Sequence, residues 1–199
     1  KFYGGKSVFT AVANINSKIA PALVGREVSL HTVDNQIREI DSSVSREGLG
    51  ANATLAVSLA GAKAEAHSKN QSLARFFTPT GNLLLPMPMV NILSGGAHAN
   101  RTLDIQDVLV LPHGATSFSE ALSWIVAIRE LAAVRGREKG LVTHLVADEG
   151  GLGIPFNTIE DACSFVVSCI EQIGLKPGVD VSLALDIAST QFFENGQYQ

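Results

Sequence analysis

The feature that most constrains this chain is a short apolar run that ends in two adjacent acids and two glycines. It reads LVADEGG over residues 145–151, with Asp148 and Glu149 as the acids. Such a run followed by glycines is typical of a buried strand that ends in a turn. Because an unpaired carboxylate is costly to bury, these acids need a cation, a hydrogen-bond donor or water nearby. The segment therefore predicts a buried strand whose carboxyl end carries polar chemistry.

Two other apolar runs carry acids in a related way. The run at 181–186 ends in Asp186, and the run at 105–111 has Asp107 near its start. Carboxylates gathered at strand ends are typical of hard-cation sites and of proton transfer. The alternative for each acid taken alone is an ordinary role, in which it caps the next helix or pairs with an arginine.

The chain divides into a helical front and a back in which strands alternate with helices. Apolar stripes predict helices over residues 7–19, 28–40, 51–67 and 72–77. Strands are predicted at 105–111, 145–147 and 181–186, after an irregular or edge strand within 83–93, and helices at 117–139 and 157–173 lie between them. Helical crossovers imply parallel strands, so we expect a parallel sheet with site residues at the carboxyl ends of its strands.

Composition narrows the class of protein. The 199 residues are 46% hydrophobic and 17% charged, which is typical of a soluble globular chain with a substantial core. The net charge of −4 and the lack of a basic block argue against a nucleic-acid surface. No apolar run approaches the ~20 residues that a membrane span needs. Cys163 and Cys169 are predicted to point to different faces of one helix, as small core residues in a reducing compartment, and we expect a cytoplasmic location.

Beyond these patterns, the chain resembles the enolase family, the phosphopyruvate hydratases. The resemblance is carried, in order, by IAPALVG at 19–25, LGANA at 49–53, PMPM at 86–89, NILSGGAHA at 91–99, DIQD at 104–107, DEGG at 148–151 and ALDIAS at 184–189. It runs through essentially the whole chain and covers about the middle half of the family's length. The resemblance is therefore far more specific than any single motif.

The resemblance implies an α/β fold. Residues 1–81 would be a mostly helical remnant of the family's α+β capping domain, and residues 82–199 the first part of an incomplete (β/α) TIM-type barrel with an unusual start. A barrel of this class needs about 250 residues, so residues 82–199 alone cannot close one. The chain also begins at Lys1 without a methionine and ends just past a turn-like Glu194-Asn195-Gly196. We therefore expect an internal fragment that is inactive by itself.

The activity implied by the resemblance is the reversible dehydration of 2-phosphoglycerate to phosphoenolpyruvate in glycolysis. Enolase-type enzymes use a lysine or histidine base with one or two Mg²⁺ ions that stabilise an enediolate, and in this family the base is a lysine. The implied cofactor is thus Mg²⁺, and the implied partner is the small-molecule substrate. The resemblance also implies a homodimer in the full-length form.

The resemblance assigns roles to five residues of this sequence. Glu149 corresponds to the acid that protonates the leaving hydroxyl, and Asp107 takes the place of a family glutamate that partners it. His98 corresponds to a histidine on a mobile loop that closes over the substrate, and Gln106 to a substrate contact. Asp186 corresponds to one of three carboxylate ligands of the first Mg²⁺.

Physical arguments bear on these roles. A glutamate that protonates hydroxide needs a raised pKa, and we expect burial and the neighbouring Asp148 to supply it for Glu149. Gln106 and Asp107 are adjacent, so a regular strand would point them to opposite faces. Both can reach one site only at a bulge or at a strand end.

Departures from the family pattern leave two alternatives open. Asp107 is one methylene shorter than glutamate, and the loop at 152–157 also differs from the family. A displacement of about 1 Å at a catalytic group can cost ~10²-fold in rate. One alternative is an enolase-like paralogue that acts on another phospho- or phosphono-carboxylate. The other is a non-catalytic binding or scaffold protein, for which the sequence offers no specific support.

Overall fold

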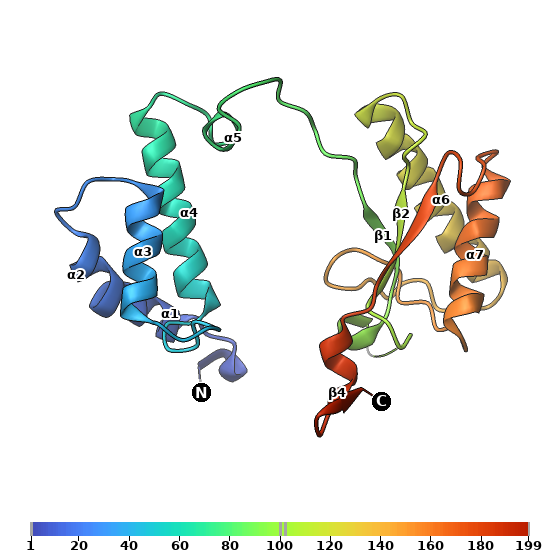
Figure 1. Ribbon diagram of the computed structural model, residues 1–199. Helices are drawn as coiled ribbons and strands as arrows, with labels where there is room; N and C mark the ends of the chain where they lie inside the picture. Colours follow the sequence, from blue (N-terminus) through green and yellow to red (C-terminus); the bar gives the residue numbers. More distant parts are fainter. Residues whose placement is uncertain (1, 100, 102, 199) are drawn as a thin grey trace. The chain divides into compact units, whose positions relative to one another are not determined.

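The chain divides into two compact units, Lys1–Leu84 and Leu85–Gln199, which are coloured blue to green and green to red (Figure 1). A computed structural model describes residues 2–99, 101 and 103–198. No helix in these ranges is both long enough and apolar enough to cross a membrane. The domain boundary expected between residues 81 and 82 stays a prediction.

The first unit is built from helices. Its elements are a 3₁₀ turn at Phe2–Gly5, α1 at Phe9–Asn14, a π-helical turn at Ile15–Ile19, α2 at Ala20–Leu23, α3 at Leu30–Ile40, α4 at Ala51–Ser68 and α5 at Leu73–Phe77. Ser29 begins α3 because its hydroxyl accepts the N–H of Thr32. The apolar faces meet around Ile19, Val33 and Ile37.

A glycine sets how closely α3 and α4 approach in this unit. A Cβ added at Gly61 would lie 3.0 Å from Cγ2 of Val33. The helices are also tied at one end, where Glu65 Oε2 accepts the backbone N–H of Leu30 at 2.7 Å. The absence of a side chain at Gly61 therefore permits close packing of the two helices.

The second unit contains a three-stranded sheet in the order β1-β2-β3. Its elements are β1 at Val90–Ser94, a 3₁₀ turn at Gly96–Ala99, β2 at Asp107–Leu111, α6 at Phe118–Glu138, α7 at Ile159–Gln172, β3 at Ser182–Asp186, a 3₁₀ turn at Ser189–Phe192, and a short hairpin of β4 at Phe193–Glu194 and β5 at Gln197–Tyr198. Val108, Val110, Ile128 and Val166 are among the buried residues that join the sheet to α6 and α7. The two helices lie side by side next to the sheet (Figure 1).

The expectation of a parallel sheet is wrong, because β2 pairs antiparallel with both β1 and β3. Between β2 and β3 the chain passes through two helices, α6 and α7, which run in opposite directions (Figure 1). One helical crossover returns the chain for a parallel strand, but a second helix reverses it once more. The next strand therefore enters the sheet from the opposite end.

The prediction of a buried strand at 145–147 is also wrong. Leu145 and Val146 are 48% and 56% exposed, and only an isolated bridge joins Val146 to Leu152. The segment folds back on itself instead, with the N–H of Ala147 donating to Gly151 O and the N–H of Gly153 to Leu145 O, both at 2.9 Å. The residue that reaches the sheet comes after the glycines. Leu152 lies beside β1 in parallel, donating to Ile92 O at 2.9 Å and accepting from Ser94 N at 3.0 Å.

The cysteines match the expectation of small helix residues. Cys163 and Cys169 are free thiols on α7, and Cys169 lies in the core. Burial raises the pKa of both thiols. Both are thereby disfavoured as thiolates.

Replacing Gly61 with valine should destabilise the first unit. The new side chain would meet Val33 at the helix contact, and overpacking of this kind costs about 1–3 kcal/mol. Urea unfolding followed by circular dichroism measures the change. The control Ala60→Val places valine at an exposed position of the same helix, where the change lowers helix propensity. Gly61→Val raises helix propensity slightly, so a larger loss at Gly61 reports the clash. Equal losses from the two variants would contradict the packing argument.

Candidate active site

One face of the sheet gathers the polar side chains. Val108 and Val110 of β2 belong to the core, so Asp107 and Leu109 point to the opposite face. In the strand register Asp107 lies opposite Ser94 of β1 and opposite Asp186 of β3. Directly paired residues of antiparallel strands share a face. Ser94, Asp107 and Asp186 therefore form a row across the three strands.

A β-bulge adds a second residue of β1 to this face. The register shifts between Asn91 and Leu93, so that Asn91 pairs with Leu109 while Ser94 pairs with Asp107. Residues three apart on a regular strand point to opposite faces. The extra residue in the bulge restores the phase, and Asn91 and Ser94 face the same way.

Among the predicted site residues whose burial is described, Asp107 is the most buried. Its exposed fraction is 1%, and that of Ser94 is 0%. The Ser94 hydroxyl donates to Asp107 Oδ1 at 2.5 Å, which satisfies one carboxylate oxygen in the interior. This bond fixes the carboxylate close to β1.

Gln106 and Asp186 meet at the end of the β2–β3 pair. The backbone N–H of Gln106 donates to Asp186 O at 3.0 Å, and the Gln106 amide donates to Asp186 Oδ2 at 3.3 Å. Asp186 Oδ1 accepts the N–H of Ala188 at 3.0 Å. Gln106 lies just before β2 and Asp107 is its first residue. The two therefore sit at a strand end, where adjacent residues can both reach one site, as the sequence analysis expected.

Glu149 is held from β1. Its Oε2 accepts from Nδ2 of Asn91 at 2.9 Å, and Asn91 is only 8% exposed. Glu149 and Asp148 are themselves exposed, so the expected burial of Glu149 is wrong. The reason is that the strand predicted before it lies outside the sheet. Glu149 reaches the site from a turn and not from the end of a buried strand.

The predicted residues thus fall into two neighbouring groups. Gln106, Asp107 and Asp186 are in direct contact or are strand partners. Glu149 joins through Asn91, whose partner Leu109 is two residues along β2 from Asp107. The structure therefore brings the four residues to the three-stranded sheet, where Glu149 is bonded to a residue of β1 and Asp186 belongs to β3, on the other side of β2.

His98 belongs to the turn Gly96–Ala99 between β1 and β2. The N–H of Ala97 donates to Oε1 of Gln191 at 3.1 Å, and the N–H of Gly96 to Leu103 O at 2.9 Å. These bonds tie the turn to the neighbouring loops. The side chain of His98 lies outside the described residues, and its role stays a prediction.

Arg129, Ser94 and Asn91 contact the turn that carries Glu149, and the sequence analysis assigned no role to these three residues. Arg129 of α6 donates to Gly150 O from Nε at 3.1 Å and from Nη2 at 2.8 Å. A Cβ on Gly151 would lie 2.0 Å from Oγ of Ser94, so only glycine fits there. Asn91 and Ser94 were visible as polar residues within an apolar strand, and a buried polar side chain needs a partner.

The donor set is suited to a hard cation, but it is incomplete. Asp107 and Asp186 are directly opposed on adjacent strands, an arrangement of like charges that is unfavourable without a cation or hydrogen bonds. Carboxylate and amide oxygens are the ligands that Mg²⁺ and Ca²⁺ take. Within residues 2–99, 101 and 103–198, however, no three His, Cys, Asp or Glu side chains are grouped closely enough to hold a metal.

Replacing Gly151 with alanine should loosen the turn that carries Glu149. The methyl group would collide with Ser94, at a cost of about 1–3 kcal/mol in the free energy of unfolding. Chemical denaturation measures it. In the double variant Ser94→Gly with Gly151→Ala the colliding side chain is gone, so its loss should be smaller than the sum of the two single losses. Strict additivity would show that the contact is not the cause.

Comparison with known proteins agrees with this architecture. Residues 1–77 match the family described as enolase, N-terminal domain, and residues 82–199 match enolase, C-terminal TIM barrel domain. These matches confirm the expected fold class, in which helices of the capping domain precede the first part of a TIM-type barrel.

Two curated relatives are similar over nearly the whole chain. The enolases of Tropheryma whipplei strains Twist and TW08/27 are each 42% identical over 191 residues, which is 96% of this chain and 44% of theirs. The chain therefore spans less than half the length of these relatives. With both of its parts matched by family models and its own length covered almost completely, the chain belongs to the enolase family.

Proposed function

We propose that this chain contributes the general acid, substrate contacts and one metal ligand to an enzyme that dehydrates 2-phosphoglycerate to phosphoenolpyruvate. The observation that carries the proposal is the arrangement around β2. Asp107 and Asp186 are strand partners there, and Glu149 is held by Asn91 from the neighbouring strand. Such an enzyme is a hydro-lyase. We further propose that the full-length enzyme is a cytoplasmic homodimer. Its ligand is the small-molecule substrate, and it binds no nucleic acid.

The reaction explains why an acid is needed. A base removes the proton at C2, and the electron pair moves to form the C2–C3 double bond as hydroxide leaves C3. Hydroxide is a poor leaving group, so Glu149 donates a proton to it and water departs. The base is a lysine in the family, and none of the residues named here takes its place.

Two polar residues of β1 position the acids in this proposal. Asn91 donates to one oxygen of Glu149, which orients the carboxyl group while its exposure leaves it accessible to substrate. Ser94 does the same for the buried Asp107. Neither needs to touch the reacting atoms, so both are positioning residues.

We propose Mg²⁺ as the cation and Asp186 as its ligand from this chain. When bound, the ion stabilises the negative charge that develops on the substrate carboxylate. Asp186 is exposed at the end of β3, where the Gln106 amide N–H donates to its Oδ2, and Mg²⁺ is commonly held by one or two carboxylates and several waters. Gln106 orients the Asp186 carboxylate and contacts the substrate. His98 closes over the substrate from its loop.

A chimera provides the direct test of the general acid. Residues 1–199 would replace the matching part of the Tropheryma whipplei enolase, which supplies the rest of the length. We expect the chimera to dehydrate 2-phosphoglycerate in a Mg²⁺-dependent manner, measured by the absorbance of the product, and the 199-residue chain alone to show no turnover. Glu149→Gln should lower kcat by about 10²–10⁴-fold.

The matched control is Glu171→Gln, the same change at an exposed position in the last turn of α7. It should leave kcat unchanged. A folded chimera without turnover, or a Glu149→Gln variant with the parental rate, would contradict the proposal.

The buried Asp107 gives one alternative a specific motive. Ser94 holds its carboxylate at β1, and the side chain is one methylene shorter than the family's glutamate, so its reach toward a ligand is reduced. This geometry favours the paralogue with a larger or differently placed phospho- or phosphono-carboxylate. In the part of the chain that the structure describes, no feature favours the non-catalytic scaffold role.

Asp107→Glu in the chimera separates the two enzymatic functions. If 2-phosphoglycerate is the substrate, the restored length should raise kcat by up to ~10²-fold. Asp104→Glu, the same change at an exposed neighbour, serves as the control. An unchanged rate on 2-phosphoglycerate, together with turnover of another phospho-carboxylate, would establish the paralogue instead.

A further inference from the structure

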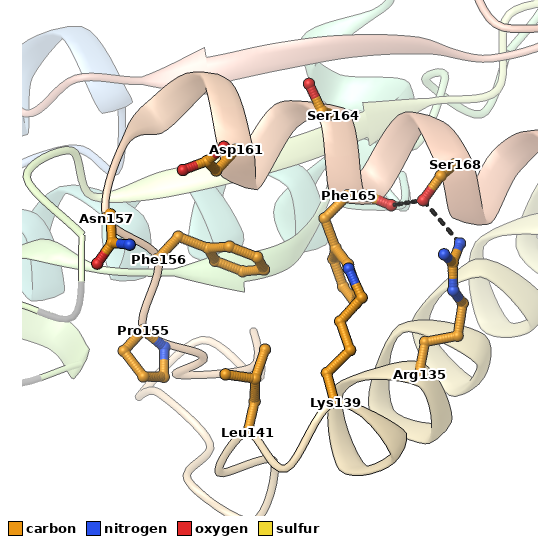
Figure 2. Close-up of a pocket in the computed structure, with 10 residues that line it drawn as sticks. All are labelled: Arg135, Lys139, Leu141, Pro155, Phe156, Asn157, Asp161, Ser164, Phe165 and Ser168. Carbon is orange, nitrogen blue, oxygen red and sulfur yellow. Dashed lines mark hydrogen bonds between the residues drawn. The ribbon is translucent and has the colours of Figure 1, made fainter.

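A cavity of the second unit lies away from the proposed active site. It has a volume of about 670 Å³ and is bordered by the C-terminal end of α6, by α7, by Leu141 and by residues 155–157 (Figure 2). None of the acids assigned above lines it. Small-molecule sites commonly have volumes of about 300–1,000 Å³. The cavity is therefore large enough for a small organic ligand.

Two cations, Arg135 of α6 and Lys139 directly after that helix, line one side of this cavity. Arg135 and Lys139 are one helical turn apart, and both lie over the ring of Phe165, at 5.7 Å from Arg135 Cζ and 5.3 Å from Lys139 Nζ. Nη1 of Arg135 donates to Oγ of Ser168 at 2.7 Å. Over residues 2–99, 101 and 103–198 the one ion pair is Lys69–Glu65, so no carboxylate in those ranges pairs with either cation.

The position of the cations has an ordinary explanation, which is incomplete. Cations near the C-terminus of α6 are favoured by the helix dipole. The dipole does not require both side chains to border one cavity or to lie over one aromatic ring. Arg135 is also half-buried and is held by Ser168, so part of its orientation is fixed before any anion arrives.

The wall of the cavity next to these cations is apolar and aromatic. Phe156 and Phe165 form a tilted pair with ring centroids 5.2 Å apart, and Leu141 and Pro155 line the wall beside them. In Figure 2 the Phe156 ring extends into the space between Pro155 and Lys139. Aromatic rings prefer offset or tilted neighbours at this spacing, so Phe156 offers a surface for another planar group.

Hydrogen-bond acceptors lie at the far end from Arg135. Asp161 and Asn157 border the cavity near the start of α7. Asp161 precedes Ser168 by seven residues, which is about 10 Å along a helix. The cavity thus presents cations at one end, aromatic rings in the middle and acceptors at the other end.

We propose that this cavity binds a purine nucleotide. Its phosphate would lie between Arg135 and Lys139, since a guanidinium matches phosphate oxygens with paired donors and an ammonium adds a second charge. The planar base would pack on Phe156. The ribose hydroxyls or the exocyclic amine would donate to Asp161 and Asn157.

Titration of the full 199-residue chain with AMP tests this site by calorimetry. We expect saturable binding at one site per chain, tighter than that of either adenosine or inorganic phosphate, because each of these carries only one half of the recognised chemistry. The double variant Arg135→Gln with Lys139→Gln should weaken AMP binding by at least about tenfold. Phe156→Leu should weaken AMP binding but leave phosphate binding as it is.

The matched control is Arg137→Gln. Arg137 is an exposed cation on the same helix that does not line the cavity, so its loss should leave the AMP affinity unchanged. Lys139→Gln alone is an exposed single change that tests the phosphate contact if the double variant does not fold. Absence of AMP binding, equal affinities for AMP and inorganic phosphate, or an equal loss in the Arg137 control would each overturn the proposal.

Discussion

Two backbone hydrogen bonds between Leu152 and β1 determine where the acidic turn lies. Leu152 donates to Ile92 O and accepts from Ser94 N, so a segment distant in the sequence is joined to the strand that carries Asn91 and Ser94. The glycine before it then lies against Ser94, where no side chain fits. Arg129 holds the carbonyl of the other glycine from α6. Contacts with β1 and with α6 consequently position the turn that carries Glu149, and Glu149 itself does not belong to a strand.

The polar face of the sheet combines groups that are unfavourable when taken singly. A buried aspartate is costly, and two directly opposed aspartates are costlier still. Ser94 satisfies one carboxylate, while Gln106 and the N–H of Ala188 satisfy the other. Polar groups that are kept in such a place, with each partner supplied, are typical of functional sites. This arrangement supports the proposed chemistry independently of the likeness to relatives.

The sequence was sufficient for the family and the helices but not for the sheet. Apolar stripes and caps predicted α6 and α7, because an amphipathic pattern and a Ser or Thr cap are local properties. The direction of a strand depends on how many helices lie between it and the strand before it. The LVADEGG run resembles a strand, so the sequence suggested one helix between successive strands where the structure has two. Leu145 and Val146 of that run proved exposed, so the burial of Glu149 could not follow from them. The partners Asn91 and Ser94 depend on a bulge, and a bulge has no clear signature in one sequence.

The bulge in β1 also makes the facing of Asn91 and Ser94 depend on the exact number of residues in that strand. Loss of one residue near Ile92 would barely alter its hydropathy, and the strand would remain apolar and well suited to pair with β2. Asn91 and Ser94 would nevertheless fall out of phase, one facing the acids and the other the helices. Length variation among natural relatives should therefore be excluded from these five residues and tolerated in the loops around them. The constraint is on the number of residues between Asn91 and Ser94, because side chains alternate between the two faces of a strand. A conservative substitution leaves that number unchanged.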